Sequence, residues 1–162
     1  MAASDIIYCR ARVSETQLIK DFIDSFFGEG VDPRPSEDII STIRDFFLAK
    51  MDGRIVGCIS VHLHNEIFAQ LRSLAVDPKC WGKGIGSRLI ELALYDAKIM
   101  GAKKAFGFSK IPDFLGKFKF RKAKASDLPK DKCLKMDRCH SCSSGYTPLI
   151  IGLDKISYVI KY

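Results

Sequence analysis

Two neighbouring stretches, LRSLAVDP at residues 71–78 and WGKGIGS at residues 81–87, decide the fold of this chain. The first belongs to a predicted strand over residues 67–76, which must end at Asp77-Pro78 because proline has no backbone N–H to donate. After the glycines, apolar residues recur at helical spacing on one face of residues 87–100, and Gly101 closes the segment. The sequence therefore predicts a strand, a glycine-rich loop and a long helix in direct succession.

The glycine-rich loop is a candidate anion site. Glycines allow strained turns and close approach of a ligand to the backbone, and the start of a helix supplies unpaired N–H groups and a positive dipole. A pyrophosphate suits such a loop. The spacing matches neither the P-loop pattern nor the dinucleotide-binding pattern, which disfavours nucleotide hydrolysis and hydride transfer. Taken alone, the loop is equally compatible with a purely structural turn.

Working outward from the loop, local patterns predict the remaining elements. Ser14 and Gln17 form an expected capping box for a helix that presents Leu18, Phe22 and Phe26 to the core. Asp52-Gly53 predicts a tight hairpin turn. Ser36 is expected to cap a second helix, which directs Ile39, Ile40 and Ile43 inward. The expected strands cover residues 6–12, 46–50, 54–63, 103–108, 118–123 and 156–161, with a helical turn over 113–117 and a loop over 126–145.

Length and charge limit the classes of protein. The 162 residues, 47% of them apolar, suit a single domain over 1–162. The formal charge of +7 is concentrated between residues 103 and 138, which carry a net +8. This favours a polyanionic partner. A nucleic acid is disfavoured because no recognition motif is apparent, and a solvated lysine face is preferred. With no apolar run that could span a bilayer and no basic start of a signal peptide, we expect a cytoplasmic protein with no membrane partner.

Six cysteines leave two alternatives. A chain of this size with a normal apolar fraction needs no disulfides, so we expect reduced thiols. Cys133, Cys139, His140 and Cys142 could supply four zinc ligands. A single Cys-x-x-Cys with a His inside it is poor spacing for zinc, so we expect no metal.

The quoted stretches, extended through Arg88-Leu89-Ile90, resemble the acetyl-CoA-binding motif of the GNAT acetyltransferases. The resemblance implies an α/β (α+β) fold with a mixed, mostly antiparallel central sheet and helices on both faces. It also implies that acetyl-CoA is the cosubstrate, with its pyrophosphate on the loop amides. Trp81 replaces the family's usual Gln or Arg. The implied cofactor-binding residues are Leu74, Ala75, Val76, Trp81, Gly82, Lys83, Gly84, Ile85, Gly86 and Ser87.

A narrower resemblance concerns the acceptor. RSLAVDP at residues 72–78, Asp127-Leu128-Pro129 and Cys139-x-x-Cys142 are similar to single-domain amino-acid acetyltransferases of the N-acetylglutamate synthase type. The resemblance implies a small amine acceptor, an amino acid such as glutamate. Arg72, on the same strand face as Gln70 by period-two alternation, would bind its carboxylate, although strand arginines are equally often structural.

The expected catalytic residues depart from the family pattern. The resemblance places the oxyanion-binding amide near residues 74–76, puts Gln70 where a Glu base is common, and puts Leu115 where a Tyr acid is common. Gln cannot accept a proton at neutral pH. Glu66, or His62 and His64, could act instead through water, although each is individually more typical of a turn or surface residue. The sequence therefore predicts an acetyl-CoA-dependent N-acetyltransferase. The alternatives are an acyl-CoA-binding regulator with lost or weak catalysis and an enzyme acting on a protein amine. A homodimer remains open.

Overall fold

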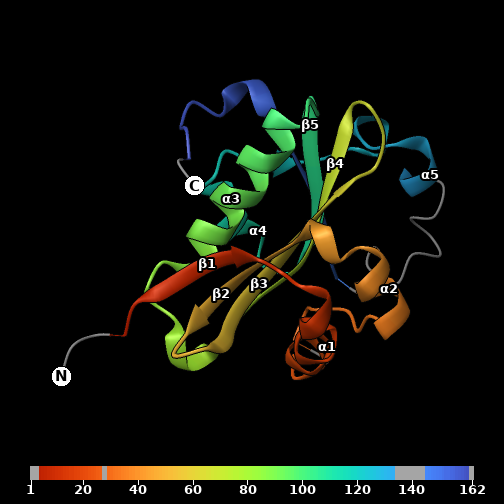
Figure 1. Ribbon diagram of the computed structural model, residues 1–162. Coiled ribbons are helices and arrows are strands. Elements are labelled where there is room, and N and C mark those ends of the chain that lie inside the picture. The colour runs from red at the N-terminus through yellow and green to blue at the C-terminus, as the bar shows by residue number, and fades with distance from the viewer. Residues whose placement is uncertain (1–3, 27–28, 134–144, 161–162) are drawn as a thin grey trace. The chain divides into compact units, whose positions relative to one another are not determined.

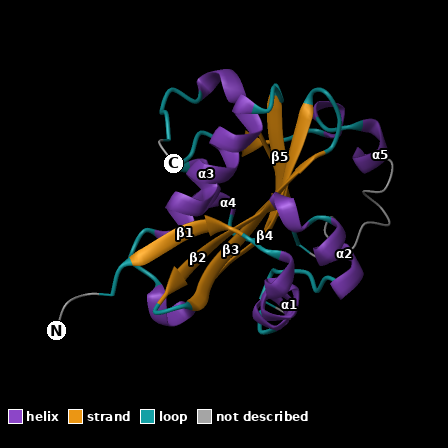
Figure 2. Ribbon diagram, viewed as in Figure 1, coloured by secondary structure: helices purple, strands orange, loops and turns teal. Residues whose placement is uncertain are grey.

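The computed structural model describes residues 4–26, 29–133 and 145–160, and it contains both helices and strands (Figures 1 and 2). The strands are β1 (Ile6–Arg10), β2 (Phe46–Met51), β3 (Arg54–Leu63), β4 (Phe68–Val76), β5 (Lys104–Ser109), β6 (Arg121–Lys122) and β7 (Thr147–Gly152). The α-helices are α1 (Thr16–Asp24), α2 (Ser36–Ser41), α3 (Ile85–Ile99), α4 (Pro112–Gly116) and α5 (Lys130–Cys133).

The strands form a seven-stranded mixed sheet in the order β1-β2-β3-β4-β5-β7-β6. β4 and β5 are parallel, whereas β1–β2, β2–β3, β5–β7 and β6–β7 are antiparallel. The predicted α/β fold with a mixed, mostly antiparallel sheet is therefore confirmed. The residues group into two compact units, Met1–His62 with Ser73–Ala93, and Leu63–Arg72 with Leu94–Tyr162. No helix within the described ranges is long and apolar enough to cross a bilayer.

In the first unit, β2 and β3 form the hairpin expected from Asp52-Gly53. Both turn residues have positive φ, 51° at Asp52 and 76° at Gly53. Two left-handed residues give a turn whose twist matches that of the flanking strands, which explains why Asp-Gly favours it. β1 then pairs with the other edge of β2, from Ile6 opposite Met51 to Arg10 opposite Phe47.

Helices α1 and α2 bury one face each in the core of the first unit (Figure 1). Ile19 and Ile23, one helical turn apart on α1, are fully buried, and so is Ile39 on α2. The predicted orientation of two other residues is wrong. Leu18 is 59% exposed and Ile40 is 47% exposed, because each lies one position beside the apolar stripe that packs inward.

The predicted helix starts also need correction. A 3₁₀ turn over Val13–Glu15 precedes α1, and the Glu15 carboxylate accepts the N–H of Arg12 at 2.9 Å. Gln17 instead donates to Asp21 one turn later, so Ser14 and Gln17 form no capping box. The residue that precedes α2 is Pro35, and Ser36 is already helical. In both cases the helix boundary is shifted by a neighbouring turn or proline.

Gly57 on β3 allows the first turns of α3 to pack closely on the hairpin. A Cβ at this glycine would lie 2.9 Å from Ile85 Cγ2 and 3.0 Å from Leu89 Cδ1. Real Cβ atoms rarely make contacts this short, so only glycine fits without displacement. Ile85 and Leu89 are themselves buried. The packing against Gly57 therefore fixes the start of the helix that follows the glycine-rich loop.

The second unit has its own aromatic core. Phe106 on β5 is fully buried with Leu128 and Ile150, and it contacts Phe68 and Phe108 edge to face. β4 and β5 pair in parallel register from Phe68 opposite Lys104 to Gln70 opposite Phe106.

The last strand lies earlier in the chain than predicted. β7 covers Thr147–Gly152, and residues 156–160 form no strand. The strand at residues 147–152 was not predicted because it contains Pro148, and a proline is uncommon in a central strand. Here the proline contributes through its carbonyl, which accepts the N–H of Ala123 at 2.9 Å. The strand predicted over residues 118–123 is likewise only two residues long, because turns that follow α4 continue to Lys119, whose φ is 70°.

Candidate active site

The glycine-rich loop connects the end of β4 to the start of α3, all within the first unit. Asp77 ends the strand and accepts the N–H of Lys79 through its carboxylate at 3.0 Å, which closes a short 3₁₀ turn. Gly82 and Gly84 both have positive φ, 82° and 75°, and space is open where a Cβ would stand on either. The backbone of this loop is therefore shaped by glycine conformations that other residues rarely adopt.

The start of α3 presents main-chain N–H groups. The Gly84 carbonyl accepts the N–H of Arg88 at 3.0 Å, so Gly84 stands at the N-terminal boundary of the helix. The amides of residues 85–87 have no partner inside the helix, as in the first turn of any α-helix. They share this end with the positive pole of the helix dipole, and the side chains of Lys79 and Lys83 are exposed nearby in sequence. The donor set fits an anion such as a pyrophosphate.

Trp81 is held in place although it is 68% exposed. Its indole N–H donates to the carbonyl of Val76 at 3.0 Å, which connects the loop to the end of β4. It is also the single tryptophan of the chain. The ring therefore provides an exposed aromatic surface beside Gly82 and a fluorescent reporter of the loop.

Ser73, inside β4, adopts a left-handed conformation with φ of 56°. This is uncommon for a residue with a side chain and costs free energy unless neighbouring groups impose it. Two groups do so. The Ser73 hydroxyl accepts from Arg34 Nη1 at 3.2 Å, and the Ser73 carbonyl accepts from the thiol of Cys58 at 3.2 Å. Burial raises the pKa of that thiol to about 12, so it is protonated and can donate.

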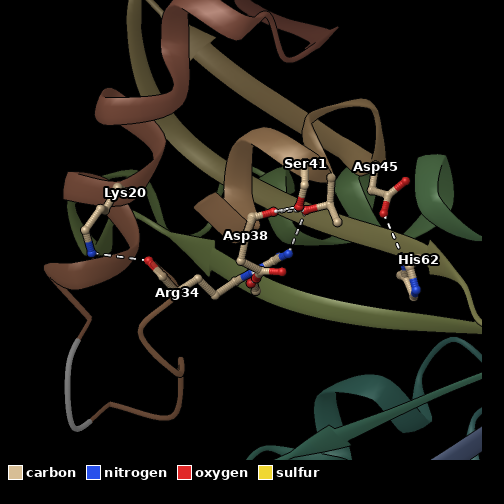
Figure 3. Close-up of polar contacts among 8 residues, drawn as sticks. Lys20, Arg34, Asp38, Ser41, Asp45 and His62 are labelled. Carbon is tan, nitrogen blue, oxygen red and sulfur yellow. Dashed lines mark hydrogen bonds and ion pairs between the residues drawn. The ribbon is translucent and has the colours of Figure 1, made fainter. Parts of the chain in front are cut away.

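Arg34 was not predicted from the sequence as a functional residue. It lies in the loop before α2 and is 3% exposed (Figure 3). Its Nε donates to Asp38 at 2.6 Å and its Nη2 to Thr42 at 2.9 Å. Lys20 from α1 donates to the Arg34 carbonyl at 3.2 Å. The flanking prolines Pro33 and Pro35 suggested only a loop, and no local pattern indicates a buried arginine.

The predicted base and substrate residues occur on the part of β4 that belongs to the second unit. Gln70 is 8% exposed and stands in register with Phe106. Arg72 is half-buried and has interactions of its own. Glu66 is exposed in the turn before β4, where the Asn65 side chain accepts the N–H groups of Ile67 and Phe68. The roles predicted for Gln70, Arg72 and Glu66 stay predictions.

The two histidines considered as alternative bases each face a carboxylate. In the first unit, His62 Nδ1 lies 3.0 Å from Asp45 Oδ2 (Figure 3). In the second unit, His64 Nε2 lies 2.9 Å from Asp131 Oδ1, and its ring meets Phe106 edge to face. A carboxylate orients an imidazole and fixes which nitrogen carries the proton.

Leu115, at the position where the family resemblance would place a Tyr acid, is 9% exposed on α4. An apolar side chain has no proton to donate, so Leu115 cannot serve as that acid.

Cys9, Cys58 and Cys80 are free thiols. Across the described ranges, no three His, Cys, Asp or Glu side chains form a group that could hold a metal ion. Cys139, His140, Cys142 and the side chain of Cys133 lie outside the described part of the chain. The expectation of reduced, metal-free thiols in that segment stays a prediction.

The model of the acetyltransferase (GNAT) family matches residues 16–110, which is more than half of the chain and includes β4, the glycine-rich loop and α3. The chain belongs to the acetyltransferase (GNAT) family. The family resemblance drawn from residues 71–78 and 82–90 is thus confirmed, and the cofactor-binding role of residues 82–87 stays a prediction.

Two relatives of the chain are named acetyltransferases. An uncharacterized N-acetyltransferase of Chlorobaculum tepidum is 37% identical over 94 residues, 57% of this GNAT chain and 61% of its own length. An amino-acid acetyltransferase of Mycobacterium tuberculosis is 25% identical over 114 residues, 68% of this chain and 66% of its own length. The chain therefore spans just under two thirds of either relative.

Among solved structures, N-acetylglutamate synthase from Neisseria gonorrhoeae, complexed with coenzyme A and N-acetyl-glutamate, superposes with a TM-score of 0.83 at 19% identity. The match covers 94% of this GNAT chain and 36% of that protein. At this identity the similarity establishes the fold alone.

Proposed function

We propose that the protein transfers the acetyl group of acetyl-CoA to the amine of a small acceptor, an amino acid such as glutamate. The observation that carries this proposal is the loop between β4 and α3, where two left-handed glycines precede a helix start in a chain of the GNAT family. The amides of residues 85–87 and the helix dipole would hold the pyrophosphate of acetyl-CoA. When bound, acetyl-CoA supplies a thioester carbonyl that an amine can attack.

The chemical step requires a neutral amine and a stabilised oxyanion. The amine nitrogen forms a bond to the acetyl carbon, the carbon–sulfur bond breaks, and the thiolate takes a proton from solvent because Leu115 cannot supply one. A main-chain N–H of Leu74 or Val76, which follow the left-handed turn at Ser73, would stabilise the oxyanion, since the N–H of Ala75 hydrogen-bonds the Cys58 sulfur. The amine proton would leave through water, Glu66 or a histidine, since Gln70 accepts none.

The acceptor is inferred from two supports. The narrower sequence resemblance points to the N-acetylglutamate synthase type, and the relative from Mycobacterium tuberculosis is named an amino-acid acetyltransferase. Arg72 would bind the acceptor's carboxylate through its planar guanidinium. We also expect the cytoplasm as the location.

A second candidate function is acyl-CoA binding without efficient catalysis. Gln70 in place of a carboxylate and Leu115 in place of a phenol favour it, because both residues are buried where the family resemblance expects a base and an acid. Binding and turnover must therefore be measured separately.

The test combines two measurements on the full chain. Quenching or shift of Trp81 fluorescence on titration with acetyl-CoA reports binding, without a label because the chain has a single tryptophan. Release of CoA is then followed with a panel of amino acids, amines and peptides. Binding with glutamate-dependent release supports the main proposal, whereas binding without release for any amine supports the second candidate. Absence of binding by calorimetry contradicts both.

A further inference from the structure

Arg34 is a charged side chain held in a nearly dry position. Its guanidinium is 3% exposed, lies 4.8 Å above the centre of the Phe46 ring and donates to three different side chains, Asp38, Thr42 and Ser73. Burial of a cation is costly unless its N–H groups are paired. The planar fork fixes the directions of these donors, so the position of Arg34 is determined by Asp38 and Thr42 together with Ser73.

Ser73 is the residue at which β4 departs from an extended conformation. With φ of 56° it would gain free energy by returning to negative φ, and this would rotate every peptide group that follows. The Arg34 contact to its hydroxyl and the Cys58 contact to its carbonyl hold the residue from two directions. Leu74 and Val76, one of whose amides the proposed reaction requires, follow closely after this turn.

We propose that Arg34 is a positioning residue, which acts through the Ser73 hydroxyl to keep β4 in the left-handed turn that sets the direction of the main-chain N–H groups at residues 74–76. This inference rests on the proposed function for its effect on catalysis, but not for its effect on the backbone. Arg34 itself touches neither acetyl-CoA nor acceptor in this assignment.

The competing explanation is that Arg34 only stabilises α2 through Asp38 and Thr42. Substitutions at Ser73 separate the two. Ser73→Ala removes the hydroxyl but keeps a Cβ that disfavours positive φ, whereas Ser73→Gly removes the hydroxyl and adopts positive φ without steric cost. Neither change touches the contacts of Arg34 to α2.

The kinetic test uses acetyl-CoA with L-glutamate as acceptor. A displacement of about 1 Å in a catalytic group can lower turnover about 100-fold, so we expect Ser73→Ala and Arg34→Lys to lower kcat by about 10- to 100-fold with a smaller change in the KM of acetyl-CoA. Ser73→Gly should retain most of the activity. The decisive variant is Arg34→Lys combined with Ser73→Gly. It should recover most of the kcat lost in Arg34→Lys, because glycine adopts positive φ without the hydrogen bond from Arg34.

A measurement without turnover tests the backbone directly. In ¹H–¹⁵N spectra of the protein with CoA alone, Ser73→Ala should shift and broaden the amide signals of residues 73–76, and Ser73→Gly should leave residues 74–76 close to their original positions. If these shifts appear but no acetyl transfer is found with glutamate or any other amine, the positioning role of Arg34 is supported and the proposed function is contradicted.

Ile23→Val provides the matched control, because it weakens the same core and changes none of the hydrogen-bonding groups of Arg34 or Ser73. It should lower the unfolding temperature and leave kcat unchanged. The inference is overturned if Ser73→Ala and Ser73→Gly have equal kcat and equal spectra, or if Arg34→Lys raises the KM of glutamate alone. It is also overturned if glycine at position 73 restores no activity to a folded Arg34→Lys variant.

Discussion

Gln70 holds a buried place on β4 where a carboxylate could serve the proposed reaction. We expect Gln70→Glu to increase kcat near neutral pH by at least about tenfold, since a well-placed general base contributes about 100- to 10,000-fold. Because Gln70 is 8% exposed, burial would raise the pKa of the new carboxyl, and the rate should fall as pH drops through that raised pKa. Steady-state pH–rate profiles measure both effects.

Gln70→Met is the control for shape and should give no increase in rate. Glu66→Gln should slow the wild-type enzyme more than the Gln70→Glu variant, because the two carboxylates would be alternative routes for one proton. If Gln70→Glu changes neither rate nor profile while Glu66→Gln abolishes activity, Glu66 is the base.

Because of Cys58, we expect the free energy of unfolding to change with pH in the alkaline range. Burial raises its thiol pKa to about 12 in the folded protein, whereas a thiol in the unfolded chain titrates near pH 8.5 to 9. Above that pH the unfolded chain loses a proton that the folded protein keeps, so the stabilising contribution, complete below about pH 8.5, is lost as pH rises toward 12. Urea unfolding between pH 9 and 10.5 should show a slope up to about 1.4 kcal/mol per pH unit steeper for wild type than for Cys58→Ala. Equal slopes would contradict the burial argument.

The role of a residue could be predicted from the sequence only where it follows from the spacing of nearby residues. Period-two alternation and the family motif selected Gln70 and Arg72 without any coordinates. Arg34 escaped because its partners lie 4, 8 and 39 residues away, and the most informative of them, Ser73, is the farthest in sequence. A buried arginine can be recognised only from the residues that surround it in the folded chain. The neighbours of Arg34 in the sequence are two prolines and a polar helix start, which do not indicate burial.

The loop before α3 allows charge and backbone strain to be separated. At Gly84, φ of 75° strains any substituted residue, while the open space around it admits a side chain. Gly84→Asn and Gly84→Asp share shape and tolerate this conformation similarly, but only Asp brings a negative charge to the helix start. We expect Gly84→Asp to weaken acetyl-CoA binding clearly more than Gly84→Asn in calorimetric titrations. Equal affinities for the two variants would place the pyrophosphate elsewhere.

Gly57 tests how the hairpin positions α3. Gly57→Ala places a methyl group within 3.0 Å of Ile85 and Leu89, so we expect a loss of about 1 to 3 kcal/mol in unfolding free energy together with weaker acetyl-CoA binding. Gly116→Ala is the control, because nothing lies within 4 Å of that Cβ. Denaturant unfolding and calorimetry give the two quantities. A Gly57→Ala variant with normal stability and affinity would show that the helix start does not depend on this contact.

Among the helices and strands, the sequence predicted those whose own residues contain a clear turn, stop or amphipathic pattern. The β2–β3 hairpin, β4 and α3 were each indicated by a turn pair, a proline stop or a long amphipathic pattern. β7 was placed too late because Pro148 interrupts a short apolar run, and a strand with partners on both sides depends on distant residues for its pairing. The starts of α1 and α2 differ from the predicted ones because a 3₁₀ turn precedes α1 and Pro35 precedes α2.

For the whole molecule, the basic character of residues 103–138 favours solvation over nucleic-acid recognition. The described lysines of this range are exposed, Lys110 and Lys117 lie over aromatic rings of Tyr146 and Phe114, and Arg121 is paired with Asp127. We therefore expect no binding of a labelled 20-nucleotide RNA at about 0.15 M salt, where exposed charges are screened beyond about 8 Å. Fluorescence anisotropy provides the measurement, with acetyl-CoA binding under the same conditions as the positive control. Micromolar RNA affinity at that salt would contradict this interpretation.

The left-handed glycines and the helix start also bear on how the site could be inhibited. If acetyl-CoA binds where we propose, a compound bearing a pyrophosphate mimic would contact main-chain N–H groups at residues 85–87, atoms that every amino acid except proline carries. Substitution of the side chains at these positions would leave those contacts in place. Resistance would have to come from distortion of the backbone at Gly82 or Gly84, and the same distortion would expel the cosubstrate. An inhibitor directed at this loop would thus leave few single substitutions that lower its affinity and spare the enzyme.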